Sequence, residues 1–391
     1  MEGKKQVAIL LPWLKMGGTN KIALHFMREL SEYCDVTLIL SEYSGELLEQ
    51  LPGNIRLIVD RMQDFREIFM DDLRHLRLGK LWKDVLYYGC IRAGRDNVDN
   101  FRYLVRRHGD ICDTEFDCAI SYHGQSPERL LNLIYRVRAK KKAAWIHGEF
   151  SNSADHCRRM NKYYEQMDRL FFVSGHTLES FQAKFDIPRS KCSVYYNPID
   201  RSEIVTKAQL PCDPAFDPAC INLVTVGRIS SEKGQDMIPA VTRRLLDAGH
   251  DVCWYVIGDG DMRPKVEQLC RDHGVADRVC LLGTRTNPYP FMAACDIYVQ
   301  PSYTEGYSTT ICEAGMLGKA IVGTAPSGGI WEQLDNGDSG MIVEATVDGL
   351  YGGISRLIAE PCLRRSFSEK IAQKNFEGTG EIRKFLDFLD R

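Results

Sequence analysis

Short apolar runs alternate with longer amphipathic runs from one end of the chain to the other. The short runs are continuous and rich in β-branched residues, which is typical of strands buried on both faces. The amphipathic runs suit helices that cross over a parallel sheet. Strands are predicted at residues 7–11, 36–40, 55–59, 118–121, 143–146, 170–173 and 192–196, and again at 221–226, 252–257, 279–282, 296–300, 320–322 and 339–343. We therefore predict an α/β fold with two doubly wound, Rossmann-like sheets, one in each half of the chain.

The two halves meet in a segment of different composition. Residues 211–218 hold three prolines beside acidic and small residues, which is typical of a connector. We expect an N-terminal domain over residues 1–198, a linker over 199–220, a C-terminal domain over 221–376 and a final helix within 377–391. Ligands of doubly wound sheets bind outside the carboxyl ends of the strands, so we expect a cleft between two facing domains.

Length and charge narrow the class of protein. The 391 residues suit two domains rather than one core, and a formal net charge of −3 does not indicate nucleic acid as a partner. No apolar run reaches the roughly 18–20 residues that a membrane-spanning helix needs. The apolar run after Lys4 and Lys5 is too short for a signal peptide, so we expect a buried strand there and a cytoplasmic protein. The 14 cysteines would then be reduced thiols. The sequence has no Cys-x-x-Cys pair of the kind that predicts a zinc site.

Two basic stretches do not fit the simple alternation. Residues 61–107 interleave Lys and Arg with aromatic and leucine side chains. Residues 136–142 have the sequence Arg-Val-Arg-Ala-Lys-Lys-Lys and precede a predicted strand. Such stretches form either solvated helix faces or a surface attracted to anionic lipid, and both interpretations stay open.

Glycines follow the first strand of each half. Gly17 and Gly18 precede a predicted helix, where a bare backbone lets a ligand approach and the helix N-terminus favours an anion, although glycine turns after strands are common. In the second half, Arg228 and Lys233 follow a strand beside two glycines. Two cations beside small residues suit a pyrophosphate group, or they are exposed surface charges.

The sequence Gly258-Asp259-Gly260-Asp261 permits several interpretations. Its glycines begin like a dinucleotide-binding motif, but Arg263 occupies the third glycine position. The two aspartates resemble a metal-binding pair. However, Asp261 stands where a helix is predicted to begin, and an N-cap is the simpler explanation. We therefore expect no metal site.

The largest block of candidate chemistry follows the strand predicted at 296–300. Glu305 is expected in a loop at the carboxyl end of that strand. Residues 306–309 lead into a helix whose free N–H groups suit phosphate. Glu313 lies one to two turns into that helix, where its carboxylate can accept two sugar hydroxyls. The alternative is an ordinary N-capped helix with exposed acids.

These motifs occur in one order along nearly the whole chain. They are Gly17-Gly18, Trp145-Ile146-His147-Gly148, Phe172-Val173-Ser174, Asn197-Pro198-Ile199-Asp200, Val226-Gly227-Arg228 with Lys233-Gly234, Ile257-Gly258-Asp259-Gly260 and the block from Glu305 to Glu313. Together they resemble the family 4 retaining glycosyltransferases of the GT-B fold. The segments at 144–149 and 305–309 look most like bacterial capsule, exopolysaccharide and lipopolysaccharide enzymes.

The resemblance implies roles for individual side chains. The implied donor-binding residues are Gly17, Gly18, Arg228, Lys233, Thr284, Arg285, Glu305, Gly306, Tyr307, Ser308, Thr309 and Glu313. Arg228 and Lys233 would hold the donor diphosphate. Glu313 would bind the ribose hydroxyls, and Glu305 would hold the transferred sugar. His147 would lie beside that sugar, so Glu305, His147 and the two cations are the implied catalytic residues.

Backbone groups complete the implied donor site. N–H groups of Gly18 and of residues 307–309 would contact the phosphates, and the backbone around Thr284 and Arg285 would meet the nucleobase. Many relatives have Gly-Phe-Gly or Gly-Phe-Pro where this chain has residues 306–308 as Gly-Tyr-Ser. The last helix of the family crosses back onto the N-terminal domain, and residues 381–391 are the candidate here.

The resemblance implies a retaining, metal-independent enzyme without a cofactor. It would move a hexosyl unit from a nucleotide sugar, with a UDP-sugar favoured, to a saccharide acceptor in bacterial surface polysaccharide biosynthesis. The expected acceptor is lipid-linked, for example to a polyprenyl chain, so the protein would touch an anionic membrane peripherally from the cytoplasmic side. Two alternatives stay open: a nucleotide-sugar 2-epimerase on the same fold, and a non-catalytic two-domain sugar-binding protein.

Overall fold

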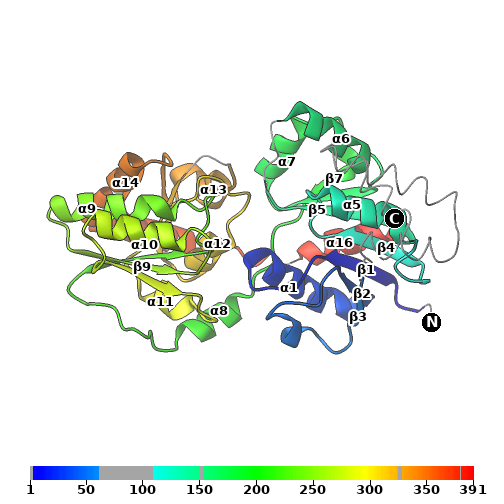
Figure 1. Ribbon diagram of the computed structural model, residues 1–391, viewed down its shortest axis with the longest axis horizontal. Coiled ribbons are helices and arrows are strands. Elements are labelled where there is room, and N and C mark those ends of the chain that lie inside the picture. Colours follow the sequence, from blue (N-terminus) through cyan, green and yellow to red (C-terminus); the bar gives the residue numbers. More distant parts are fainter. Residues whose placement is uncertain (1–2, 61–108, 149–152, 325–327, 379) are drawn as a thin grey trace, which may run out of the picture. The chain divides into compact units, whose positions relative to one another are not determined.

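The computed structural model describes residues 3–60, 109–148, 153–324, 328–378 and 380–391. The chain divides into two compact units, which are coloured from blue to red along the sequence in Figure 1. The N-terminal unit comprises Met1–Phe172, Ser180–Tyr195 and Gly380–Arg391, and the C-terminal unit comprises Val173–Glu179 and Tyr196–Thr379. Each unit is built around one sheet.

The sheet of the N-terminal unit has the order β3-β2-β1-β4-β5-β6-β7, with parallel pairing throughout. Its strands are β1 (Gln6–Leu11), β2 (Asp35–Leu40), β3 (Arg56–Val59), β4 (Phe116–Ser121), β5 (Ala139–Ile146), β6 (Arg169–Phe172) and β7 (Cys192–Val194). The described helices are α1 (Gly18–Tyr33), α5 (Pro127–Arg136), α6 (Ala154–Tyr164), α16 (Glu381–Asp390) and α7 (Gly175–Gln182), which begins in the C-terminal unit. Helices α5 and α6 cover one face of the sheet, and α1 and α16 cover the other (Figure 1).

Aromatic rings fill the core beneath α1 and α16. Phe26 of α1 lies 5.0 Å from Trp145 of β5 and 5.4 Å from Phe385 of α16, measured between ring centroids. Trp145 also stacks on Phe171 of β6 at 4.5 Å. All four side chains are fully buried. The last helix of the chain is therefore part of the core of the N-terminal unit, where such ring pairs add to the stability gained from burial.

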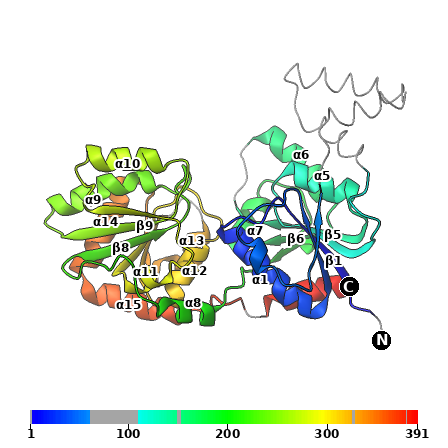
Figure 2. The same cartoon turned by 60° about the horizontal axis from the view of Figure 1, so that its bottom comes forward.

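The sheet of the C-terminal unit has the order β10-β9-β8-β11-β12-β13, again with parallel pairing. Its strands are β8 (Ile221–Val226), β9 (Val252–Ile257), β10 (Val279–Gly283), β11 (Ile297–Gln300), β12 (Ala320–Thr324) and β13 (Met341–Val343). Its described helices are α8 (Arg201–Ala208), α9 (Ile238–Asp247), α10 (Arg263–Asp272), α11 (Tyr289–Ala294), α12 (Thr309–Met316), α13 (Gly328–Gln333), α14 (Val347–Ala359) and α15 (Pro361–Ala372). Helices α9, α10 and α14 cover one face, and α8, α11, α12 and α15 lie on the other (Figure 2).

Every strand predicted from the apolar runs is present, and only its ends shift. The largest shift is in β5, which begins at Ala139 rather than at residue 143. The segment expected to be a linker, residues 199–220, contains α8, which packs against α11 and α12. None of the described helices has the length and apolar character needed to cross a bilayer.

The basic stretch at 136–142 runs from the last residue of α5 into β5, so it is not a helix face, and its Arg138 and Lys140 side chains are 47% and 64% exposed. Its lysines lie in β5, and Arg136 is buried against Asp60. Nζ of Lys141 donates to the carbonyl of Phe388 at the end of α16, and Nζ of Lys142 donates to the carbonyl of Ile134 near the end of α5. Helix C-termini attract cations, so these charges have partners within the unit. The other basic stretch, residues 61–107, lies outside the described residues.

Candidate functional site

The candidate residues of the C-terminal unit lie at the carboxyl ends of β8 and β11. In the sheet, β9 and β10 lie on one side of β8, and β11 to β13 lie on the other. The strand order therefore reverses between β8 and β11, and such a switch point leaves an opening at the carboxyl ends. The main-chain pairing of β8 with β11 covers Leu223 and Val224 alone, so it stops before that edge.

Glycines allow the loops after β8 and β9 to touch. Gly227 donates its N–H to the carbonyl of Ile257 at 2.9 Å, and Gly258 donates to the carbonyl of Gly283 at 2.9 Å. A Cβ atom on Gly258 would lie 2.0 Å from the carbonyl oxygen of Gly227, and the φ of Gly258 is 143°. Backbone packing therefore requires glycine at position 258. This requirement explains the glycine without invoking a dinucleotide-binding motif.

The aspartates after β9 have local partners. Asp259 accepts from the next N–H at 2.8 Å and lies 3.3 Å from Nη1 of Arg263. Asp261 is not the N-cap that we expected. Helix α10 begins at Arg263 with Met262 in the cap position, because Pro264 favours the first turn. In the part of the chain that the structure describes, no three His, Cys, Asp or Glu side chains are grouped as metal ligands.

Lys233 and Glu305 form an ion pair at this edge. Gly234 brings the loop after β8 against the chain after β11, since its φ is 68° and a Cβ there would lie 2.0 Å from the carbonyl oxygen of Pro301. Nζ of Lys233 reaches Oε2 of Glu305 at 2.6 Å, and the two side chains are 23% and 12% exposed. The two predicted residues from different loops are therefore brought together.

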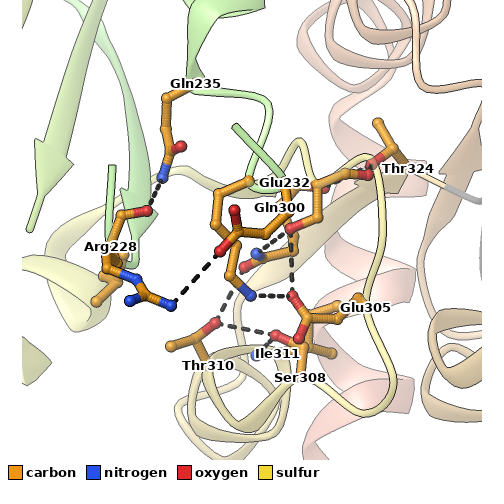
Figure 3. Close-up of polar contacts among 12 residues, drawn as sticks. Arg228, Glu232, Gln235, Gln300, Glu305, Ser308, Thr310, Ile311 and Thr324 are labelled. Carbon is orange, nitrogen blue, oxygen red and sulfur yellow. Dashed lines mark hydrogen bonds and ion pairs between the residues drawn. The ribbon is translucent and has the colours of Figure 1, made fainter. Parts of the chain in front are cut away.

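Arg228 lies on the loop that carries Lys233, and it is mainly exposed. Its side chain is 73% exposed, and its Nη2 lies 3.5 Å from Oε1 of Glu232 (Figure 3). The side chain of Gln235 donates to the carbonyl of Arg228 at 2.9 Å and so holds the backbone. An exposed ion pair of this length contributes little to stability, so the guanidinium can turn toward an anionic ligand with little loss of free energy.

A network of buried and partly buried polar side chains, which the sequence alone did not predict, supports Glu305 (Figure 3). Ser302 donates to Oε2 of Glu305 at 3.2 Å, and Nε2 of Gln300 donates to Ser302 at 2.8 Å. Oε1 of Gln300 accepts from the hydroxyls of Tyr298 at 2.9 Å and Thr310 at 3.0 Å. The sequence contains only a weak signal for this hydrogen-bond network, namely the glutamine Gln300 at the end of an apolar strand.

Helix α12 begins at Thr309, and its N-cap is Ser308. The hydroxyl of Ser308 accepts from the N–H of Ile311 at 3.4 Å. The N–H of Ser308 itself donates to Oε1 of Gln333 at 3.0 Å, so it is already paired in this structure. The interpretation of an ordinary N-capped helix is thus correct for the cap, but Glu305 is not an exposed acid. The phosphate contacts of Tyr307 and Thr309 stay predictions.

Glu313 lies within α12 and contacts α11. Its Oε1 accepts from the hydroxyl of Tyr289 at 3.2 Å. Burial raises the pKa of Tyr289, and the negative charge of Glu313 raises it further, so this hydroxyl remains a donor. Thr284 and Arg285 follow the last residue of β10 and are exposed.

In the N-terminal unit, Gly17 is the N-cap of α1 and Gly18 is the first residue of that helix. The φ of Gly17 is 166°, which is extended backbone, and a Cβ atom there would meet nothing within 4 Å. Neither backbone geometry nor packing therefore requires glycine at 17, in contrast to Gly258. The bare backbone leaves room for a ligand at the start of α1.

His147 follows β5 and is held as one tautomer. Its Nε2 lies 2.7 Å from the carbonyl oxygen of Tyr122, which can only accept, so Nε2 carries the proton. Oε1 of Gln125 accepts from the N–H groups of His147 and Gly148 at 3.2 and 3.0 Å. Burial, together with the neighbouring His123, lowers the pKa of His147 to about 3. The ring is therefore neutral near pH 7, with Nδ1 as an acceptor.

The lowered pKa of His147 predicts a loss of stability in acid. An unfolded histidine titrates near pH 6.5, so below about that pH the unfolded chain binds a proton that the folded chain excludes until about pH 3. The free energy of unfolding should fall as the pH falls through this range, by up to about 1.4 kcal/mol per pH unit from this group. H147Q should therefore show a shallower slope in chemical denaturation between about pH 7 and about pH 5. H250Q is the control, and an unchanged slope in H147Q would contradict the argument.

Part of the chain matches a known protein family and several known proteins. Residues 217–374 match the family described as glycosyl transferases group 1. The N-acetylgalactosamine-N,N'-diacetylbacillosaminyl-diphospho-undecaprenol 4-alpha-N-acetylgalactosaminyltransferase of Campylobacter jejuni is 27% identical over 208 residues, which are 53% of this chain and 55% of that protein. The lipopolysaccharide core biosynthesis glycosyltransferase LpsE of Rhizobium meliloti is 29% identical over 174 residues, 44% of this chain and 46% of that protein. The matches thus span about half the length of these curated relatives.

A solved structure extends the similarity in fold to the whole chain. Anabaena Alr3699/HepE, in complex with UDP and glucose, has a TM-score of 0.72 at 16% identity and covers 99% of both chains. At this identity the likeness concerns the fold. The two parallel-sheet units and the similarity to solved structures show that this chain has the GT-B fold, and the family match and the relatives show that it resembles the family 4 glycosyltransferases and that residues 217–374 carry a group 1 domain.

Proposed function

We propose that this chain is a retaining, metal-independent glycosyltransferase. It moves a hexosyl unit from a nucleoside diphosphate sugar, with UDP as the favoured nucleotide, to a saccharide acceptor. The observation that supports this most is the ion pair of Lys233 with Glu305 at the carboxyl ends of β8 and β11, with the exposed Arg228 on the same loop as the lysine. The names of the relatives, and the UDP bound by Anabaena Alr3699/HepE, point in the same direction.

The two cations act on the leaving group. When the bond from the anomeric carbon to the phosphate oxygen breaks, its electron pair passes to the diphosphate, whose negative charge rises. Arg228 offers a guanidinium that suits two phosphate oxygens, and Lys233 offers a point charge that Glu305 holds in place. Cations fixed before the reaction stabilise the charge that develops in the transition state. They supply the positive charge that a divalent ion gives in other enzymes.

Retention follows if the acceptor attacks from the face that the diphosphate leaves. The anomeric centre then passes through an oxocarbenium-like state, and a phosphate oxygen of the leaving group accepts the proton of the acceptor hydroxyl. Glu305 accepts hydrogen bonds from hydroxyls of the transferred sugar, and the neutral His147 accepts one at Nδ1. The carboxylate of Glu313 can accept several hydrogen bonds, one of them from Tyr289, and it binds the ribose hydroxyls.

Exposed backbone completes the donor site. Gly17 and Gly18 let the phosphates approach the start of α1, and Thr284 and Arg285 meet the nucleobase at the end of β10. The proposed acceptor is a lipid-linked saccharide of bacterial surface polysaccharide synthesis, taken from the inner face of the membrane. The relative from Campylobacter jejuni is named for a diphospho-undecaprenol substrate, and that from Rhizobium meliloti for the lipopolysaccharide core.

The proposal is tested by turnover of UDP-, GDP- and ADP-sugars in the presence of EDTA. We expect slow hydrolysis of one α-linked donor, a UDP-sugar, because water can replace the acceptor. Proton NMR should then show the α-anomer as the first sugar released. Turnover that starts only after Mg²⁺ or Mn²⁺ is added would contradict metal independence, and a β-anomer would contradict retention.

The same samples separate the two alternatives. An epimerised nucleotide sugar formed without any acceptor would indicate a 2-epimerase. Binding of free sugar without affinity for any nucleotide would indicate a sugar-binding protein. The block from Glu305 to Glu313, together with Arg228 and Lys233, favours transfer over both alternatives.

A further inference from the structure

Helix α13 holds the backbone of residues 306–308, next to Glu305, through the side chain of Gln333. This side chain is 1% exposed, and its amide pairs with both backbone groups of one residue. The N–H of Ser308 donates to Oε1 at 3.0 Å, and Nε2 donates to the carbonyl oxygen of Ser308 at 2.6 Å. Nε2 also lies 3.0 Å from Sγ of Cys312. Since one group of Ser308 donates and the other accepts, the amide fits in one orientation.

The carbonyl of Gly306, next to Glu305, is enclosed by α13 and by the start of α7. Ser174 donates to this carbonyl at 3.3 Å and is fully buried. A Cβ atom on Gly329 would lie 2.0 Å from the same oxygen, so α13 is in close contact with it. The hydroxyl of Ser174 also accepts from the N–H of Thr177 at 3.0 Å. A change of the Ser174 rotamer would therefore break this contact and uncap α7 together.

Glu332, beside Gln333, ties α13 to the start of α7. Its Oε2 accepts from the N–H groups of Gly175 at 3.0 Å and His176 at 3.4 Å. A carboxylate at a helix N-terminus forms strong hydrogen bonds there. Its Oε1 accepts from the hydroxyl of Tyr196 at 2.5 Å, and the ring of Tyr196 lies 5.8 Å from that of Tyr307. All of these residues belong to the C-terminal unit.

We propose that Gln333 and Glu332 are positioning residues of the donor site, which fix the backbone of residues 306–308 and thereby the direction of Glu305. The inference rests on the proposed function, since Glu305 is assigned there to the transferred sugar. Neither residue is assigned to the reacting atoms. The nucleoside is assigned to Glu313 and Arg285 and the diphosphate to Arg228 and Lys233, so a defect in positioning should reduce kcat far more than it weakens binding of the nucleotide.

The test is Q333N, whose amide is one methylene shorter and cannot reach both groups of Ser308. With the donor that the wild type turns over, kcat should fall about 10–100-fold, because a displacement of about 1 Å has effects of this size. The Kd of UDP should change by less than about threefold, which corresponds to less than about 0.7 kcal/mol of binding free energy. E332Q keeps the shape of its side chain but loses the charge at α7, and its kcat should fall in the same way. Q373N and E369Q make the same changes at exposed positions of the same unit and serve as controls.

The outcomes separate this inference from the proposed function. If the wild type turns over no donor, both fail. If the wild type is active and Q333N keeps its kcat within twofold, this inference alone fails. A lower melting temperature with an unchanged kcat per folded molecule would also overturn it, since that is the result of a purely structural contact. If Q333N does not fold, E332Q decides by the same criteria.

Discussion

Replacing Lys233 by alanine is expected to lower kcat of glycosyl transfer about 10²–10³-fold, the usual effect of removing one preorganised group that stabilises developing negative charge. The ammonium lies 2.6 Å from Glu305 and is 23% exposed, so it is fixed before a donor arrives. The interaction strengthens as the diphosphate departs, and kcat and kcat/KM should therefore fall together. Arg228→Ala should change both in the same direction, with a smaller loss because this side chain is mainly exposed.

Initial rates at saturating donor measure this effect in wild type, K233A and R228A. Lys265→Ala is the matched control, since Lys265 is 56% exposed and its ammonium lies 3.6 Å from Asp236 in the same unit. Its kcat should stay within about twofold of the wild type, as exposed pairs contribute little. If K233A and R228A both kept near-normal rates, the assignment of the diphosphate to these cations would be wrong.

The fold was predictable because its strands are continuously apolar. Runs such as residues 221–226 and 252–257 are buried on both faces, so their sequence reports their environment directly. Where a strand includes charged residues, this signal fails. Lys140 to Lys142 were assigned to a segment before β5, although they belong to it, because their long side chains reach partners outside the core.

The candidate site was predictable only in part. Lys233 and Glu305 stand out in the sequence because glycines and strand ends surround them, and the structure brings them together. Gln333 acts through Ser308, which is 25 residues away in the chain, and Gln300 acts through its near neighbours Tyr298 and Ser302, but no motif in the sequence marks either set of contacts. Asp261 was misplaced because Pro264 sets the start of α10, and the preference of proline for the first turn outweighed that of aspartate for the cap.

Replacing Arg136 by methionine is expected to lower the free energy of unfolding by about 3–5 kcal/mol. Nη1 and Nη2 bond to the two carboxylate oxygens of Asp60 at 2.5 and 2.8 Å, and the side chains are 4% and 9% exposed. Nε donates to the carbonyl of Gly109 at 3.0 Å. Methionine fills much of the same volume but leaves the Asp60 carboxylate buried without its cation. Urea denaturation of R136M and the wild type measures the difference.

Two further variants distinguish the loss of a partner from the loss of packing. R243M makes the same change in an exposed pair with Asp247, 39% and 63% exposed, and should cost about 0–1 kcal/mol. The double variant R136M/D60L removes both charges, so it should recover much of the loss, because an apolar pair often replaces a buried ion pair without net cost. A cost below about 1 kcal/mol for R136M would mean that water reaches Asp60 and solvates its charge. Arg136 would then be a surface charge, as expected for a solvated helix face. It would not be a buried link between α5 and the residue that follows β3.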